Sequence, residues 1–148
     1  MEQVAGHKGY TYRNLGLWQK AQEFAVEVVR LVDGLPARRS AELMGHQLAR
    51  AATSVAANIA EGHGRFSIPA YRNHLLIARG SATEADSWLD LLLRLGYVHE
   101  SRVTALHARC DELIAALTRR IRDLTKQAGP TRIHEEVAEY ELLSEGAP

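Results

Sequence analysis

Apolar residues recur every three or four positions along most of the chain, and polar residues fill the positions between them. This spacing predicts α-helices over residues 15–33, 40–61, 68–95 and 100–126. Short breaks that contain glycine or proline separate the four segments. No stretch shows the alternation of a half-buried strand. The pattern therefore predicts an all-α protein, an antiparallel up-down-up-down four-helix bundle.

The expected domain boundaries follow from these helices and from the charge distribution. The bundle is predicted over residues 14–128, between an N-terminal arm (1–13) and an acidic, flexible C-terminal tail (129–148). The formal net charge of the 148 residues is zero, but residues 131–148 hold one arginine against five glutamates. That segment carries a net charge of −4, so the rest of the chain carries +4. A mildly basic body precedes an acidic tail.

Targeting signals and cysteine usage point to the cytoplasm. The first residues lack the apolar core of a signal peptide, and no run of 18 apolar residues occurs. The chain has a single cysteine, Cys110, so no internal disulfide can form. We therefore expect a cytoplasmic protein without a membrane segment.

The end of the third predicted helix is more apolar than a bundle helix requires. Its apolar side chains span an arc of about 200°, roughly twice the width that one core contact needs. They are Trp88, Leu89, Leu91, Leu92, Leu93 and Leu95. Either the N-terminal segment, with Tyr10 and Tyr12, or another copy of the chain could cover the excess. The candidates for an oligomer interface are Trp88, Leu91, Leu92 and Leu95.

Residues 58–67 read N-I-A-E-G-H-G-R-F-S and connect the second and third predicted helices. They match only the first two glycines of G-x-G-x-x-G, a helix precedes them instead of a strand, and no P-loop lysine follows. A structural turn explains more of the residues. We expect Gly62 to take a left-handed conformation and Gly64 to let the chain reverse. The predicted turn consists of Asn58, Glu61, Gly62, Gly64, Arg65 and Ser67.

Capping and charge add detail to this turn. Ser67 is placed to cap the third helix, as Ser40 and Ser101 are for the second and fourth. Glu61 lies in the last turn of the second helix, where its charge opposes the helix dipole. An acid in that position needs a cationic partner, and Arg65 or Arg72 is the nearest candidate.

Enzymatic, metal and ligand sites find little support in the sequence. Glu61 and His63 could form an acid–base pair, with Ser67 as a nucleophile, but the G-x-S-x-G elbow is absent. His107, Cys110 and Asp111 lie close in sequence, yet no H-E-x-x-H or C-x-x-C motif completes a zinc site. We expect no enzymatic activity, no cofactor, no metal and no small-molecule ligand.

Two sets of arginines are candidates for contacts with nucleic acid or with a partner protein. Arg65, Arg72 and Arg79 are spaced by seven, which would place them along one ridge. Pairing with acids such as Glu61 or Asp86 is the favoured alternative. Arg102, Arg109 and Arg120 share a face of the fourth helix, where nearby acids indicate a solvated, salt-bridged surface.

The chain resembles the 23S rRNA intervening-sequence protein family, also called the four-helix-bundle protein family. The similarity covers about residues 10–125, and the tail lies outside it. Its most distinctive part is the N-I-A-E-G-x-G-R-x-S signature. The residues that carry it are Y-R-N-L-G-L-W-Q-K-A (12–21), S-V-A-A-N-I-A-E-G-H-G-R-F-S (54–67), Tyr71, I-A-R-G-S (77–81), Glu84 and L-G-Y-V (95–98).

The resemblance implies a four-helix bundle that assembles into a ring-like homopentamer with no known enzymatic activity. One relative, the accessory protein of diversity-generating retroelements, is a strongly basic pentamer that binds nucleic acid and a reverse transcriptase. This chain is only mildly basic. It also has Ala70 where the family usually has an acidic residue, and His74 where an aromatic is usual.

Three functional hypotheses remain. The first, which we prefer, is a non-enzymatic, self-assembling scaffold that presents a surface to a partner. The second is a nucleic-acid-binding accessory factor of the same architecture, which would bind with strong salt dependence. The third is a small enzyme that uses Glu61 and His63, which would require a concave pocket around residues 58–67.

Overall fold

The computed structural model describes residues 11–129, and this part of the chain is helical and contains no strand. A short 3-10 helix, η1 (Tyr12–Asn14), precedes four α-helices. These are α1 (Gly16–Asp33), α2 (Arg39–Gly64), α3 (Ile68–Arg94) and α4 (Glu100–Gln127). The prediction of an all-α, four-helix protein is confirmed. Residues 1–10 and 130–148 lie outside the described residues, so the N-terminal arm and the acidic tail stay predictions.

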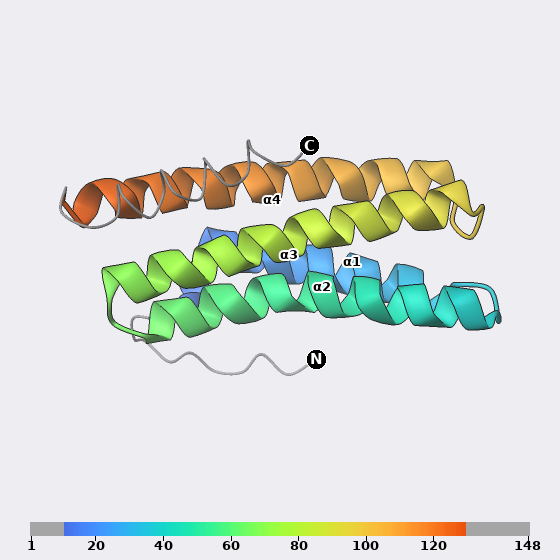
Figure 1. The fold of residues 1–148 in the computed structure, drawn as a ribbon, viewed down its shortest axis with the longest axis horizontal. Coiled ribbons are helices and arrows are strands. Elements are labelled where there is room, and N and C mark those ends of the chain that lie inside the picture. Colours follow the sequence, from blue (N-terminus) through green and yellow to red (C-terminus); the bar gives the residue numbers. More distant parts are fainter. Residues whose placement is uncertain (1–10, 130–148) are drawn as a thin grey trace, which may run out of the picture.

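The four helices lie side by side along their length (Figure 1). Arg50 of α2 hydrogen-bonds Glu84 of α3, and Ser40 near the start of α2 hydrogen-bonds Tyr97 just after the end of α3, so these two helices run in opposite directions. The α2–α3 turn and the C-terminal end of α4 lie at the same end of the molecule (Figure 1). We call this the turn end. Within residues 11–129, no helix is long and apolar enough to cross a lipid bilayer.

The predicted apolar stripes meet in one buried core. All four helices contribute large side chains with less than 2% of their surface exposed, among them Phe24, Leu48, Ile59, Leu89 and Leu117. Small residues of α2 and α3, such as Ala52 and Ala82, are also fully buried and let the helices approach closely. The helices therefore pack with their apolar stripes facing inward, because burial of these side chains supplies most of the favourable free energy of folding.

The helix ends agree only in part with the predicted caps. Ser67 caps α3, because its side chain accepts a hydrogen bond from the Ala70 amide at 3.4 Å. The caps expected at Ser40 and Ser101 are wrong, because α2 and α4 begin before these residues and no side-chain cap forms. At the other end of α3, Gly96 takes φ +70°, a conformation that glycine adopts readily and that ends the helix.

Candidate functional site

Gly62 lies within α2, and its role differs from the one we expected. The helix continues to Gly64, and Gly62 is buried without a left-handed conformation. A Cβ atom on Gly62 would lie 2.6 Å from the Cβ of His74 and 3.0 Å from Cδ2 of Tyr71. The left-handed assignment is therefore wrong. Gly62 allows α3 to pass close to the last turns of α2.

The chain reversal between α2 and α3 is made by Phe66. Phe66 has φ +53°, the only non-glycine residue with positive φ in residues 11–129, and its side chain is 99% exposed. Gly64 is the last residue of α2, and a Cβ atom there would meet nothing within 4 Å. The reversal that we assigned to Gly64 therefore occurs two residues later. A phenylalanine in this conformation is a local strain that sequence reasoning missed.

A polar network connects this turn to α3. Arg65 donates a hydrogen bond to Glu61 at 2.6 Å, which is the ion pair that the sequence indicated. Nδ1 of His74 lies 3.1 Å from Oδ1 of Asn58, and Nε2 of His74 lies 3.9 Å from Oε1 of Glu61. The hydrogen bond from Arg65 holds the pKa of the Glu61 carboxyl below its ordinary value. Sequence reasoning noticed His74 only as a departure from the family pattern.

The geometry around residues 58–67 offers little to the enzyme hypothesis. Glu61 engages Arg65 and His74, and the His63 ring stands edge-on to Tyr71 with 5.9 Å between ring centroids. A carboxylate with a lowered pKa does not have the raised proton affinity of a general acid. Two open grooves of about 370 Å3 each lie between α1 and α4 and between α1 and α2, and neither is lined by Glu61, His63 or Ser67.

The candidate arginine ridge does not form, and Arg65 pairs with Glu61, as the favoured alternative predicted. Arg72 is 7% exposed, and its Nε donates a hydrogen bond to Oγ1 of Thr125 at 2.9 Å. Arg79 is half-buried. The prediction that Arg72 contacts a partner at the surface is therefore wrong. Arg72 links α3 to α4 instead. Its aliphatic stem is buried while its head group is satisfied, as is usual for a buried arginine.

The α3–α4 contact contains a small polar cluster without metal-site geometry. Nδ1 of His107 lies 2.5 Å from Oδ1 of Asp86, and the Cys110 thiol donates to the carbonyl of Ala82 at 3.2 Å. Burial, with Asp86 nearby, raises the pKa of Cys110 to about 12. Asp111 points to solvent, and no group of three metal-ligating side chains occurs within residues 11–129. Cys110 is a buried thiol of the core.

The apolar arc of α3 is partly covered within the chain. Leu92 is fully buried in the core, so it is wrong as an interface candidate. Trp88 is half-buried against the core, with its indole N–H 3.4 Å from Glu84. Leu91 and Leu95 remain 37% and 43% exposed. The arc therefore contains both core and surface residues, and the sequence periodicity alone did not distinguish the two.

Leu43 of α2 extends this exposed apolar surface. It is 60% exposed and lies seven residues before Arg50, while Leu91 lies seven residues after Glu84. Because Arg50 pairs with Glu84 and the helices run in opposite directions, Leu43 and Leu91 lie at the same level. Leu43, Leu91 and Leu95 are called the apolar patch from here on.

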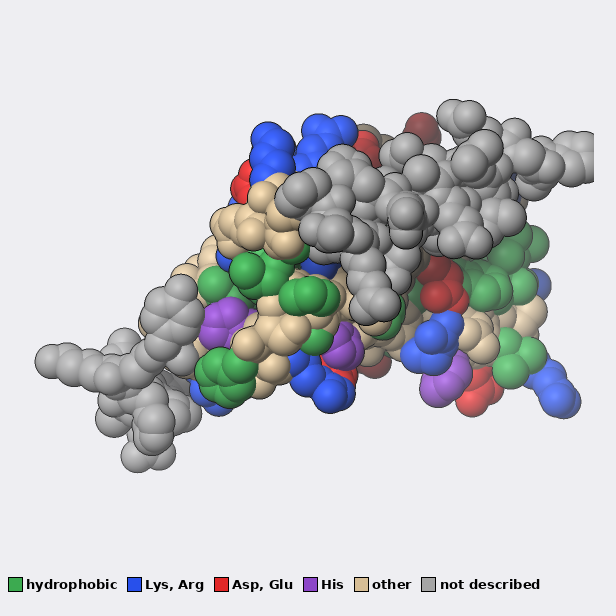
Figure 2. Space-filling model, turned by 60° about the vertical axis from the view of Figure 1, so that its left-hand side comes forward, with side chains coloured by type: hydrophobic (Ala, Val, Ile, Leu, Met, Phe, Trp, Pro, Cys, Tyr) green, Lys and Arg blue, Asp and Glu red, His purple; other side chains and the backbone are tan. Residues whose placement is uncertain are grey.

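Other hydrophobic side chains also reach the surface, and sequence reasoning did not select them. They are Val26 and Val29 of α1, Phe66 and Ile68 at the α2–α3 turn, and Ile77 of α3. Figure 2 shows hydrophobic side chains at the surface among charged side chains and histidines. Single exposed hydrophobics are common on protein surfaces, so only their grouping carries information.

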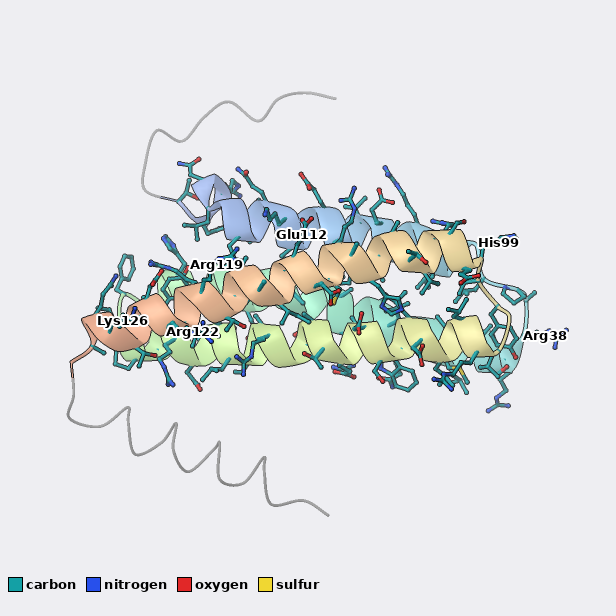
Figure 3. The ribbon with its side chains drawn as sticks, turned by 90° about the horizontal axis from the view of Figure 1, so that it is seen from above. Arg38, His99, Glu112, Arg119, Arg122 and Lys126 are labelled. Atoms are coloured by element: carbon teal, nitrogen blue, oxygen red, sulfur yellow. The ribbon has the colours of Figure 1, made fainter. Side chains whose placement is uncertain are left out.

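The surface of α4 changes in charge along its length. Arg119, Arg122 and Lys126 are exposed near its C-terminal end, which lies at the turn end, and Arg38 and His99 lie at the opposite end (Figure 3). Nearer the middle, Arg109 pairs with Glu23 of α1 at 3.9 Å. Arg120 stacks over the Tyr71 ring, 5.6 Å from its centroid.

These observations define a class of protein, an all-helical bundle. Its distinctive features are an exposed apolar patch, a basic surface at the end of α4 and a polar network at the α2–α3 turn. A family model described as 23S rRNA-intervening sequence protein matches residues 13–119. The chain belongs to this family, and its resemblance to the family is confirmed.

A solved structure is also similar to the chain. It is a protein with unknown function from the S23 ribosomal protein family of Bacteroides thetaiotaomicron, 31% identical in sequence, with a TM-score of 0.67. The match covers 71% of this chain and 97% of that protein. No curated protein matches the chain.

Proposed function

We propose that the protein is a non-enzymatic, self-assembling bundle of up-down-up-down topology that forms a homopentameric scaffold and presents a surface to a partner. The observation that supports self-assembly is the apolar patch, in which Leu43 of α2, Leu91 of α3 and Leu95 at the end of α3 are all exposed. Contiguous exposed apolar side chains mark interaction sites more often than isolated ones do. The number of subunits rests on the family resemblance.

The contact that we propose is between copies of the chain. Burying three leucines removes apolar surface from water, and that contribution grows with the area buried. In a ring, one surface of each copy contacts a different surface of the next, so the partner of the apolar patch is another part of the same molecule. Val26 and Val29 of α1 are exposed apolar residues that fit this role.

The mass of the protein in solution tests the proposal. Light scattering coupled to size exclusion should give about five times the chain mass of 16.4 kDa, roughly 82 kDa. Leu43→Glu with Leu91→Glu should lower the mass, because two carboxylates would be buried in the contact. Thr83→Glu, an exposed position on α3 outside the patch, is the control and should leave the mass unchanged.

The possible results separate parts of the proposal. A wild-type protein that runs as a monomer would refute self-assembly. Any other defined multimer would refute the pentamer and retain the scaffold. An unchanged mass for the double variant would show that the apolar patch is not the contact.

A second candidate function, nucleic-acid binding, is favoured by the exposed cations near the end of α4. Residues 117–128 contain four cations and one acid, and Arg119, Arg122 and Lys126 are exposed. Such a surface contacts phosphates without reading bases, so affinity should fall steeply with salt. Arg119→Ala with Arg122→Ala should then weaken binding to a single-stranded RNA and reduce its salt dependence. No measurable binding at low salt would refute this candidate.

A further inference from the structure

A groove opens between the start of α1 and the second half of α4. Its volume is about 370 Å3, and its apolar surface comes from Leu15, Leu17, Ala116 and the Tyr71 ring beneath them. Two cations, Lys20 and Arg120, border it. The groove therefore combines an apolar floor with a basic rim, which suits an amphipathic segment that carries carboxylates.

The surroundings of the groove add further positive charge. Arg119, Arg122 and Lys126 lie on the same end of α4, where Asp123 is the one acid of residues 117–128 (Figure 3). Cations in the last turns of a helix are favoured by its dipole, which explains part of this charge. Lys20 has no such explanation, because it lies in the first half of α1, away from the helix C-terminus.

The chain itself contains a segment of complementary chemistry. Residues 131–148 read T-R-I-H-E-E-V-A-E-Y-E-L-L-S-E-G-A-P and carry a net charge of −4. Apolar residues are interspersed with the glutamates, namely Ile133, Val137, Tyr140, Leu142 and Leu143. The same segment therefore offers apolar side chains for the floor of the groove and carboxylates for its rim.

The position of this segment in the chain brings it within reach. α4 ends at Gln127, and Gly129 takes φ +77°, a conformation that lets the backbone leave the helix axis. Arg120 lies nine residues before Gly129, about 14 Å back along the helix. The residues from 130 to 137 span up to about 26 Å when extended, so Val137 can return to the groove.

We propose that residues 131–148 fold back on their own bundle and occupy the α1–α4 groove. Val137 and Tyr140 contact Leu17 and Ala116, and the neighbouring glutamates face Lys20 and Arg120. The intramolecular connection makes this association effective despite the small contact, because the local concentration of the tethered segment is in the millimolar range.

Photocrosslinking in the full-length protein tests this proposal. Tyr140 is replaced by p-benzoylphenylalanine, and the crosslinked peptides are mapped by mass spectrometry at low salt. We expect the crosslinks to fall on the peptides that contain Leu17 and Ala116. Crosslinks that are absent, or that scatter over other helices, would overturn the proposal.

A mixture of isotopically light and heavy protein identifies the source of the segment. Crosslinks within one isotope form support docking onto the same chain. Crosslinks between light and heavy chains would show that the groove holds the segment of another copy, and would overturn the intramolecular contact.

Charge reversal separates docking from chance proximity. Lys20 is exposed, so Lys20→Glu should fold normally and lower the crosslink yield about fivefold. Arg39→Glu makes the same charge change at an exposed site at the opposite end and should have no effect. Adding Glu139→Lys to Lys20→Glu should restore part of the yield. An unchanged yield for Lys20→Glu would overturn the role of the basic rim.

Discussion

Where α2 packs against α3, small residues and hydrogen bonds hold the two helices in register, whereas α1 and α4 leave an open groove at the turn end. Gly62 brings α3 close to α2, and Ser54 hydrogen-bonds Ser81 at 3.0 Å along the same line of contact. Between α1 and α4, Arg109 and Glu23 approach to 3.9 Å, and both are about half exposed or more. The α2–α3 contact therefore specifies the fold, whereas the α1–α4 contact leaves surface that is open for binding.

Polar groups account for part of this difference. Arg50, Ser54 and Asn58 of α2 form hydrogen bonds with residues of α3, and Ser40 bonds Tyr97, which follows α3. Each of these groups finds its hydrogen-bond partner only at one relative position of the two helices. If the register slips, the hydrogen bond is lost, and leaving a partly buried polar group without a partner costs free energy. The α1–α4 contact relies on apolar side chains, which tolerate small displacements.

The substitution with the largest expected effect on this comparison is Gly62→Ala. The new Cβ atom would lie 2.6 Å from the Cβ of His74, which cannot move without shifting α3. We expect the free energy of unfolding to fall by about 3 kcal/mol, as overpacking of a tight contact does. Urea denaturation at one fixed protein concentration measures it, since self-association adds to apparent stability.

Gly80→Ala is the matched control for that substitution. Gly80 also lies inside a helix, but a Cβ atom there would meet nothing within 4 Å. Alanine should therefore raise the free energy of unfolding by about 0.5–1 kcal/mol through its higher helix propensity. If both substitutions change stability alike, the close approach at Gly62 does not specify the α2–α3 contact.

A second test enlarges one alanine on each side of the comparison. Ala85 is fully buried and lies one turn after Ser81, and Ala85→Leu should cost about 2 kcal/mol of stability. Ala116 is half-buried beside the groove, and Ala116→Leu should change stability by no more than about 0.5 kcal/mol. Thermal or urea unfolding measures both. Equal costs would mean that the groove is as tightly packed as the α2–α3 contact.

The smallest expected effect concerns Glu61 and pH. Its pKa is lowered in the folded protein from an ordinary value of 4.5, chiefly by the hydrogen bond from Arg65. A lowered pKa contributes stability that is present above pH 4.5 and is lost as pH falls through the folded-state value. Glu61→Gln should therefore be slightly less stable than the wild type at pH 7 and equal to it near pH 2.

Glu23→Gln provides the comparison from the other pair of helices. Glu23 is more exposed than Glu61 and lies at the limit of ion-pair distance from Arg109. Its replacement should leave stability unchanged at both pH values, because exposed pairs of this kind contribute little. A pH-dependent loss at Glu23 equal to that at Glu61 would contradict the distinction.

Much of the helical architecture follows from local patterns. The third helix was predicted over 68–95 and is observed over Ile68–Arg94, because its apolar spacing continues on both sides of Gly80. The Ser67 cap and the Glu61–Arg65 pair are contacts between residues three or four positions apart. Such contacts depend on the geometry of a single turn, which spacing specifies.

The candidate site was less predictable, because its key residues depend on neighbouring helices. Gly62 has a glycine's usual place near a helix end, and only the position of His74 shows that close packing requires it. Arg72 resembles a surface residue in the sequence, yet Thr125 of α4 provides a partner for it in the interior. Phe66 gave no local signal of its conformation, since phenylalanine seldom adopts positive φ.

The sequence by itself determined the helical class, the four helices, their approximate ends and the family, since periodicity and a local signature are properties of consecutive residues. Only the tertiary structure decided which leucines of the α3 arc are core and which are surface. Leu92 is buried and Leu91 is exposed, although both belong to one continuous apolar stretch. The division depends on the rotation of α3 relative to α2 and α4, and packing between helices sets that rotation.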